Sequence, residues 1–173
     1  GGTYSEIGTP TVNTTTYNDT GLSESTTYYY RVRAYNASGN SSYSDEAGAV
    51  TAPAAPSGLS ASTASASQIS LSWTDNSSNE TGFKIERKTG SGGTYSEIAT
   101  PAASTTTYND TGLSESTTYY YRIRAYNASG NSSYSDEANA LTLPAAPSGL
   151  SASAASTSQI DLIWIDNSSG ETG

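Results

Sequence analysis

The chain has 173 residues, of which 34% are hydrophobic, and its formal net charge is −9. Such an acidic chain is a poor partner for nucleic acid or an anionic membrane, because both are negatively charged. It contains no cysteine and no histidine, so it has no disulfide framework and lacks the commonest thiolate nucleophile and general base. No apolar stretch approaches the ~20 residues that a membrane-spanning helix needs. We therefore expect no membrane span, no catalytic residue, no cofactor and no metal site.

The sequence repeats itself with a period of 91 residues. Residues 1–82 and 92–173 align without a gap and differ at 14 positions. A period of this length is too long for a solenoid unit, whose neighbours share one core, and suits an independently folding module. We expect a complete module over residues 53–143, flanked by proline-containing linkers, and partial modules over residues 1–52 and 144–173. The chain is thus expected to begin and end inside a module.

Alternation of apolar and polar residues indicates β-strands along the complete module. It runs through QISLSWT (68–74), GFKIERK (82–88) and TTYYYRIRAYN (117–127), with Lys84 and Glu86 on the outward side of the second segment. Shorter strands are expected at YSEIA, TTTYND and SYSDEANALTL, separated by turn-rich stretches. Together with a strand at the start of the module, at PSGL (56–59), these six segments make seven strands in about 90 residues, which predict an all-β fold, a seven-stranded antiparallel β-sandwich. The residues expected in its core are Ile69, Leu71, Trp73, Phe83, Ile85, Tyr119, Tyr121 and Ile123.

These residues resemble the fibronectin type III family of immunoglobulin-like sandwiches. The supporting pattern is PSGL at 56–59 in strand A, Trp73 at the end of strand B, GFKI at 82–85 in strand C, and Leu113 six residues before Tyr119. In that family the Leu-to-Tyr spacing forms a tyrosine corner, in which the ring packs inward and the hydroxyl holds the E–F connection. The resemblance implies a run of tandem modules similar to those of secreted bacterial proteins.

By the same resemblance, residues 1–51 would supply strands C′, E, F and G of one module, and residues 147–165 strands A and B of another. Strand C, which the family places between C′ and F, has no counterpart in either fragment. Neither fragment is therefore expected to bury a core by itself. We expect residues 1–51 to be ordered by strands from another copy, in a head-to-tail contact that builds filaments.

The basic residues concentrate on the expected strands C and F, which are neighbours in the family. One sheet face should therefore be basic and studded with tyrosine. It has two interpretations: a cross-strand charge ladder around Glu86, which we favour, or a docking face for an acidic or sugar partner. The residues of this candidate docking face are Tyr29, Arg31, Arg33, Lys84, Tyr120, Arg122 and Arg124.

Ten asparagines begin Asn-x-Ser/Thr triplets, which are acceptors for N-glycosylation. Loops rich in Asn, Ser and Thr also generate such triplets by chance, so glycosylation and ordinary turn chemistry both stay open. The candidates are Asn13, Asn18, Asn36, Asn40, Asn76, Asn79, Asn109, Asn127, Asn131 and Asn167. In the B–C loop, Asp75, Asn76, Asn79 and Glu80 offer oxygen ligands, but their spacing departs from the known calcium-loop pattern.

The two copies of strand B differ on their outward face. Ser72 and Thr74 of the complete module become Ile163 and Ile165 in the last copy. Exposed apolar strands invite association. We therefore expect Ile163 and Ile165 to contact a neighbouring module, subunit or sugar.

Near-identical copies, a polar surface and the missing catalytic groups favour an architectural role. The main hypothesis is a structural repeat of an extracellular or cell-surface fibre, stalk or filament, whose partners are other copies of itself and glycans. The alternative is a spacer, or a carbohydrate- or adhesion-binding module, attached to a secreted enzyme. Copy number in the full-length protein distinguishes the two.

Overall fold

The computed structural model describes residues 2–173 and, over that range, consists of β-strands and connecting loops without a helix. It divides into two compact units whose boundary falls between Thr51 and Ala52. The all-β prediction is confirmed. Within the part of the chain described, no helix is long and apolar enough to cross a membrane.

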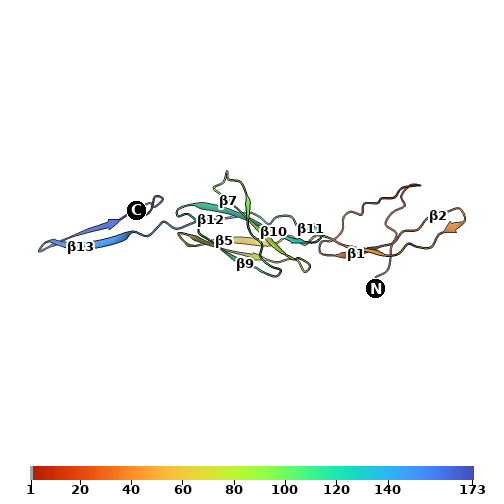
Figure 1. Cartoon of the computed structure of the whole chain (residues 1–173), viewed down its shortest axis with the longest axis horizontal. Helices are drawn as coiled ribbons and strands as arrows, with labels where there is room; N and C mark the ends of the chain where they lie inside the picture. Colours follow the sequence, from red (N-terminus) through yellow and green to blue (C-terminus); the bar gives the residue numbers. More distant parts are fainter. Residues whose placement is uncertain (1) are drawn as a thin grey trace. The chain divides into compact units, whose positions relative to one another are not determined.

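The second unit contains a sandwich of two antiparallel sheets, called here the central module (residues 57–141; Figure 1). One sheet has the order β5–β6–β9, and the other has β10 paired with β7, β11 and β12, with β8 beyond β7. These are the seven expected strands together with a two-residue strand, β11. Their bounds are β5 Ser57–Ser65, β6 Gln68–Thr74, β7 Gly82–Thr89, β8 Ser96–Ala99, β9 Thr107–Thr111, β10 Thr118–Asn127, β11 Gly130–Asn131 and β12 Ala138–Leu141.

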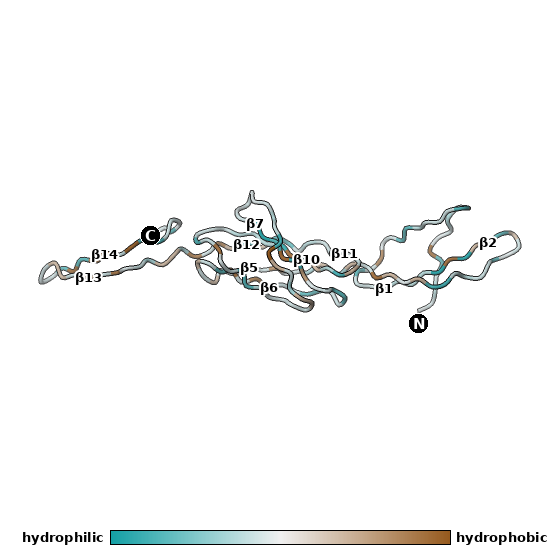
Figure 2. The backbone as a smooth tube through the Cα atoms, in the orientation of Figure 1, coloured by the Kyte–Doolittle hydropathy of each residue, from teal (hydrophilic) through white to brown (hydrophobic). Residues whose placement is uncertain are grey.

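The core of the central module lies between these sheets, as predicted. All eight residues expected there are buried, joined by Leu113 and Ala125. The Trp73 and Phe83 rings meet edge to face, with their centroids 5.6 Å apart. Figure 2 shows the hydrophobic stretches of the central module gathered where β6, β7 and β10 lie. The alternation of apolar and polar residues therefore turns the apolar side of each of these strands toward the core.

The tyrosine corner is present. The ring of Tyr119 is buried, and its hydroxyl accepts a hydrogen bond from the Ser114 amide at 3.0 Å. The same contact recurs 91 residues earlier, where the Tyr28 hydroxyl accepts from the Ser23 amide at 2.9 Å. The corner thus holds the loop before β10, and its counterpart holds the loop before β1 (Thr27–Tyr30).

The edge of the sheet alongside β10 is irregular between β11 and β12. Instead of carbonyl oxygens, the hydroxyls of Ser132 and Ser135 accept the amides of Ala125 and Ile123, at 2.9 and 3.2 Å. The amides of the same serines donate back to the Ala125 and Ile123 carbonyls, at 2.9 and 2.8 Å. Three residues of β10, from Ile123 to Ala125, therefore face four residues, from Ser132 to Ser135, and the one extra residue is the arrangement of a bulge.

The first unit has less regular structure. β1 pairs with β4 (Ala47–Val50), and β2 (Tyr35–Asn36) with β3 (Gly39–Asn40). Every residue from 2 to 51 is exposed or half-buried, in agreement with the expectation that this fragment buries no core. One expectation is wrong: Arg31 and Arg33 lie outside any strand, because β1 ends at Tyr30. The equivalent residues of β10 stay in a strand because β7 pairs with them, and the first unit has no counterpart of β7.

After the central module the chain forms a hairpin of β13 (Ser148–Ser156) and β14 (Gln159–Ile165), called here the C-terminal hairpin. Both of its faces are exposed. Ile160, Leu162 and Trp164 on one face are among the most exposed large apolar side chains, although their equivalents 91 residues earlier form the core of the central module. This fragment also buries no core.

Candidate functional site

The outer face of β7 and β10 is organised around Glu86. Its side chain points outward, as expected, yet the residue is only 8% exposed because its neighbours cover it. Arg122 donates to Oε2 through Nε and Nη2, at 2.8 and 2.6 Å, and the Tyr134 hydroxyl donates to Oε1 at 2.6 Å. Arg124 Nη2 lies 3.6 Å from Oε1. Burial opposes ionisation, but the hydrogen bonds from Tyr134 and Arg122 outweigh it and lower the pKa of Glu86.

Above Glu86 the cations and tyrosine rings of this face stack on one another. The Arg122 guanidinium lies between two rings, with its Cζ 4.0 Å from the centre of Tyr95 and 3.9 Å from that of Tyr134. Lys88 Nζ lies 4.8 Å from the Tyr95 ring and 2.8 Å from a carboxylate oxygen of Glu137. The Tyr95 hydroxyl donates to the same carboxylate. Each cation here is therefore held by a ring and a carboxylate of its own chain.

The structure brings the four candidate docking residues of the central module onto one surface. Tyr120, Arg122 and Arg124 of β10 lie opposite Lys88, Glu86 and Lys84 of β7. Lys84 lies 4.0 Å from Glu97 and 5.4 Å from the Tyr126 ring, and Lys88 lies 5.0 Å from the Tyr120 ring. These are the contacts of a cross-strand charge ladder, extended by aromatic rings.

A similar stack forms in the first unit without a neighbouring strand. The Arg31 guanidinium lies 3.9 Å from the ring centres of both Tyr4 and Tyr43, and Arg33 lies 4.8 Å from Tyr43. Tyr29 is exposed. Stacking of arginine on tyrosine therefore forms in the first unit from Tyr4, Tyr43 and the two arginines, without a counterpart of β7.

A second polar cluster, which was not predicted from the sequence, lies between the two sheets. Asp110 of β9 is only 4% exposed, and its two carboxylate oxygens accept from Arg87 Nη1 at 2.9 and 2.8 Å. The Tyr121 hydroxyl donates to the same carboxylate at 2.9 Å, and burial together with this bond raises the pKa of Tyr121. The sequence does contain one indication of this cluster. Alternate residues of a strand face the same side, so Arg87 of β7 lies on the inward side with Phe83 and Ile85.

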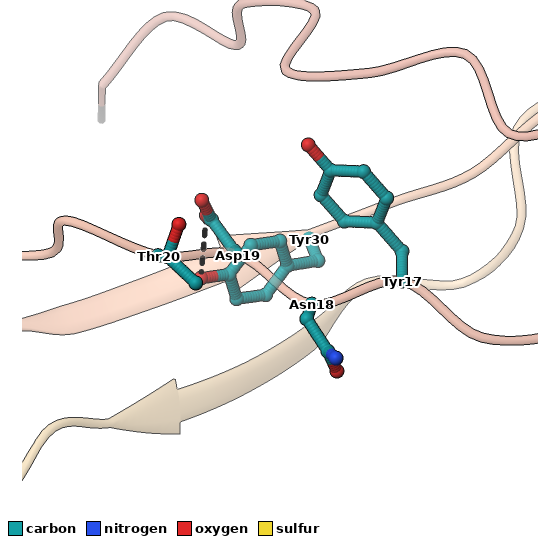
Figure 3. A pocket seen from close by; sticks show the side chains of 5 residues that line it. All are labelled: Tyr17, Asn18, Asp19, Thr20 and Tyr30. Carbon is teal, nitrogen blue, oxygen red and sulfur yellow. Dashed lines mark hydrogen bonds between the residues drawn. The ribbon is translucent and has the colours of Figure 1, made fainter.

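An open hollow in the first unit contains the counterpart of this cluster (Figure 3). The Tyr30 hydroxyl donates to Asp19 at 3.1 Å, as Tyr121 does to Asp110. The hollow measures about 630 Å³. The residues equivalent to its lining segment 17–20 belong to β9 in the central module, where they pair with β6. The hollow therefore lies where the central module has the strand β6. Its lining residues are Tyr17, Asn18, Asp19, Thr20 and Tyr30.

All the candidate glycosylation asparagines are exposed except Asn79 and Asn127, which are half-buried. Two of them already bond the linkers: Asn76 Nδ2 donates to the Ala55 carbonyl at 2.8 Å, and Asn167 Nδ2 donates to the Ala146 carbonyl at 2.8 Å. These asparagines therefore hold the start of a module against its B–C loop. Glycosylation at any of the ten stays a prediction.

The oxygen-rich side chains of the B–C loop accept hydrogen bonds from backbone amides. Asp75 Oδ1 accepts the Ser77 amide at 3.0 Å, and Glu80 Oε1 accepts the Ser104 amide at 3.2 Å. Among residues 2–173, no group of three or more Asp, Glu, His or Cys side chains is placed to hold a metal ion.

Ile163 and Ile165 are 69% and 59% exposed. Ile165 packs over Gly149, whose built Cβ would lie 3.2 Å from its Cδ1. The apolar residues on the opposite face of the hairpin are exposed to a similar degree, so exposure does not single out these two isoleucines. Their contact with a neighbour stays a prediction.

Comparisons with known proteins agree with this architecture. The model of the fibronectin type III domain matches residues 54–140. The chain is 35% identical to exoglucanase B of Cellulomonas fimi, over 97% of this chain and 16% of that protein. It is 44% identical to an alpha-amylase of Niallia circulans, over 54% of this chain and 7% of that protein.

Among solved structures, the FN1–FN3 domains of chicken CNTN1 align over 73% of this chain and 46% of that chain. The TM-score is 0.50 at 22% identity, which is a likeness of fold alone. The chain thus spans a small part of the length of the enzymes that it matches.

Proposed function

The chain belongs to the fibronectin type III family, and from this premise we propose that it is a non-catalytic spacer within a larger extracellular enzyme that acts on polysaccharide. Coverage is the observation that carries the proposal: nearly the whole chain aligns with a segment of exoglucanase B that makes up 16% of that enzyme. The alpha-amylase match has the same character. The absence of histidine and cysteine from the sequence fits a segment that leaves the chemistry to another domain.

The charged face favours a spacer over a sugar-binding module. A sugar ring that stacks on tyrosine needs the face of the aromatic ring. Arg122 lies over both Tyr95 and Tyr134, and Lys88 lies over Tyr95 and Tyr120. Displacing these cations would also break their bonds to Glu86 and Glu137. The face is therefore better suited to stiffening the sheet than to binding a ligand.

Two measurements test the proposal. The full-length reading frame should contain a polysaccharide-hydrolase domain beside a small number of these modules. The purified chain should also stay in the supernatant when it is mixed with insoluble cellulose, starch or chitin. Sedimentation with one of these polymers, abolished by Tyr95→Ala or Tyr120→Ala, would instead identify a carbohydrate-binding module.

A second candidate function, a self-associating fibre or stalk, is favoured by one specific observation. Ile160, Leu162 and Trp164 are exposed, whereas their equivalents in the central module are core residues. The hollow of the first unit lies where such a strand would fit. In the central module Ile69 lies opposite Asp110 and Leu71 opposite Tyr108.

By the same register, β14 of a second copy would place Ile160 opposite Asp19 and Leu162 opposite Tyr17. The chain would then associate head to tail by strand addition. Sedimentation velocity over increasing protein concentration tests this, with Leu162→Asp as the disrupting variant. A chain that stays monomeric at all concentrations, or a variant that associates as well as the parent, would exclude this mode.

A further inference from the structure

Glu115, in the loop between β9 and β10, contacts the part of the chain that follows the central module. Its Oε2 accepts the Ala145 amide at 2.6 Å and the Ser168 hydroxyl at 2.8 Å. Its Oε1 accepts the Ser169 amide at 3.2 Å and lies 3.5 Å from the Ser169 hydroxyl. Both oxygens of one carboxylate are therefore engaged by three residues that lie 30 or more positions further along the chain.

These donors come from two different places. Ala145 belongs to the linker between β12 and β13, whereas Ser168 and Ser169 belong to the loop that follows β14. The linker is held at a second point, because the Ser116 amide donates to the Leu143 carbonyl at 3.2 Å. The Asn167 side chain also ties the loop back to the linker at Ala146. Loop, linker and the start of the next repeat thus form one hydrogen-bonded junction.

The junction is also tightly packed. A Cβ built on Gly170 would lie 2.2 Å from the Cβ of Ser116, so any larger residue there must push the two loops apart. Position 170 is one of the 14 at which the two copies differ, since the earlier copy has Asn79. The carboxylate and the two serines do recur 91 residues earlier in the sequence, as Glu24, Ser77 and Ser78.

The charge state of Glu115 suits this role. The amide of Ala145 and the hydroxyl of Ser168 lower the pKa of Glu115, against a smaller opposing effect of desolvation and of the nearby charge of Glu171. An ionised carboxylate is the stronger acceptor. At neutral pH the group is therefore in the form that these donors require.

We propose that Glu115 is a clasp that fixes the central module to the next repeat of the same chain, the bound surface being its linker and the loop after β14. Neighbouring modules move freely unless their interface restrains them. With the clasp closed, the central module and the repeat that follows it are held together as a semi-rigid pair; without it, the two are joined by a flexible linker. The clasp holds whether the protein is an enzyme or a fibre, so its test is independent of the function proposed above.

Amide hydrogen exchange of the whole chain measures the clasp, because two of its donors are backbone amides. In Glu115→Ala we expect the Ala145 and Ser169 amides to exchange roughly tenfold faster or more, as local openings lose their charge-assisted bonds. Glu115→Gln, which keeps an acceptor oxygen without the charge, should give a smaller increase. Gly170→Asn, which restores the residue of the earlier copy, should release Ser169 by steric conflict with Ser116.

The matched control is Glu24→Ala, which removes the same residue type from the equivalent loop of the earlier copy and should leave Ala145 and Ser169 unchanged. The Ser114 amide should stay protected in Glu115→Ala, which shows that the loop itself is intact. Unchanged exchange at both amides in Glu115→Ala would overturn the proposal. Equal acceleration by Glu24→Ala, or equal acceleration along the β13–β14 ladder, would also overturn it.

Discussion

The chain offers a matched pair of tryptophans for measuring how much the core contributes. Trp73 and Trp164 occupy the same repeat position, but Trp73 is 5% exposed and Trp164 is 59% exposed. The rings of Trp73 and Phe83 also pack edge to face. Replacing a buried tryptophan by alanine costs ~3–5 kcal/mol, because transfer energy is lost and a cavity remains. An exposed site usually changes stability by less than ~0.5 kcal/mol.

We therefore expect Trp73→Ala to lower the free energy of unfolding of the central module by ~3–5 kcal/mol, and Trp164→Ala to leave it nearly unchanged. Urea denaturation followed by circular dichroism measures both, at a protein concentration low enough to prevent association. Tryptophan fluorescence adds a second readout. In Trp164→Ala only the buried Trp73 remains, so the emission should be blue-shifted. In Trp73→Ala only the exposed Trp164 remains, so the emission should be red-shifted. Equal losses for the two variants would refute the assignment of the core to the central module alone.

Three further substitutions test the polar contacts. Asp110→Ala should cost about 3 kcal/mol, because it strands Arg87 beside the core, and a loss below about 1 kcal/mol in urea denaturation would contradict a structural ion pair. Tyr119→Phe should cost about 1 kcal/mol and expose the Ser114 amide to hydrogen exchange; an unchanged exchange rate would show that the corner hydroxyl is not the acceptor. The folded-state pKa of Glu86 lies below its ordinary value of 4.5, so its contribution is complete above that pH and is lost as the pH falls through the lower folded-state value. Glu86→Gln should therefore lower stability at neutral pH and flatten the decline on the acid side, and a variant with the parent's acid profile would contradict this.

The apolar half of the fold follows directly from the sequence. In a strand, alternate residues face opposite sides, so placing Ile69 and Trp73 inward required only the period of the pattern. The tyrosine corner came from the resemblance to the family, through the spacing of Leu113 and Tyr119. The end of β1 was not accessible in this way. The segment that contains Arg31 has nearly the same sequence as β10. Whether it forms a strand depends instead on a neighbouring strand, which local sequence does not reveal.

The polar half depends on tertiary contacts. Asp110 and Arg87 lie 23 positions apart, and nothing in either segment says that the two meet between the sheets. Parity would place Arg87 inward, but an inward arginine is acceptable only if a carboxylate is found for it. Glu115 illustrates the same limit: its loop contains serine, glutamate and threonine, as ordinary turns do. Its role appears only once the following linker is placed beside it.

The serine-held edge between β11 and β12 has a consequence for how such repeats fold beside one another. Polar edge strands specify their register weakly, and neighbouring modules of nearly the same sequence offer one another the wrong strand at high local concentration. Ser132 and Ser135 limit this, because a slip by one residue would withdraw both hydroxyls from the amides of Ala125 and Ile123. The extra residue also interrupts the regular ladder at this edge, and bulges of this kind make an edge a poorer template for a foreign strand. In the central module the hydroxyls of Ser132 and Ser135 therefore disfavour a shifted pairing of this edge with β10.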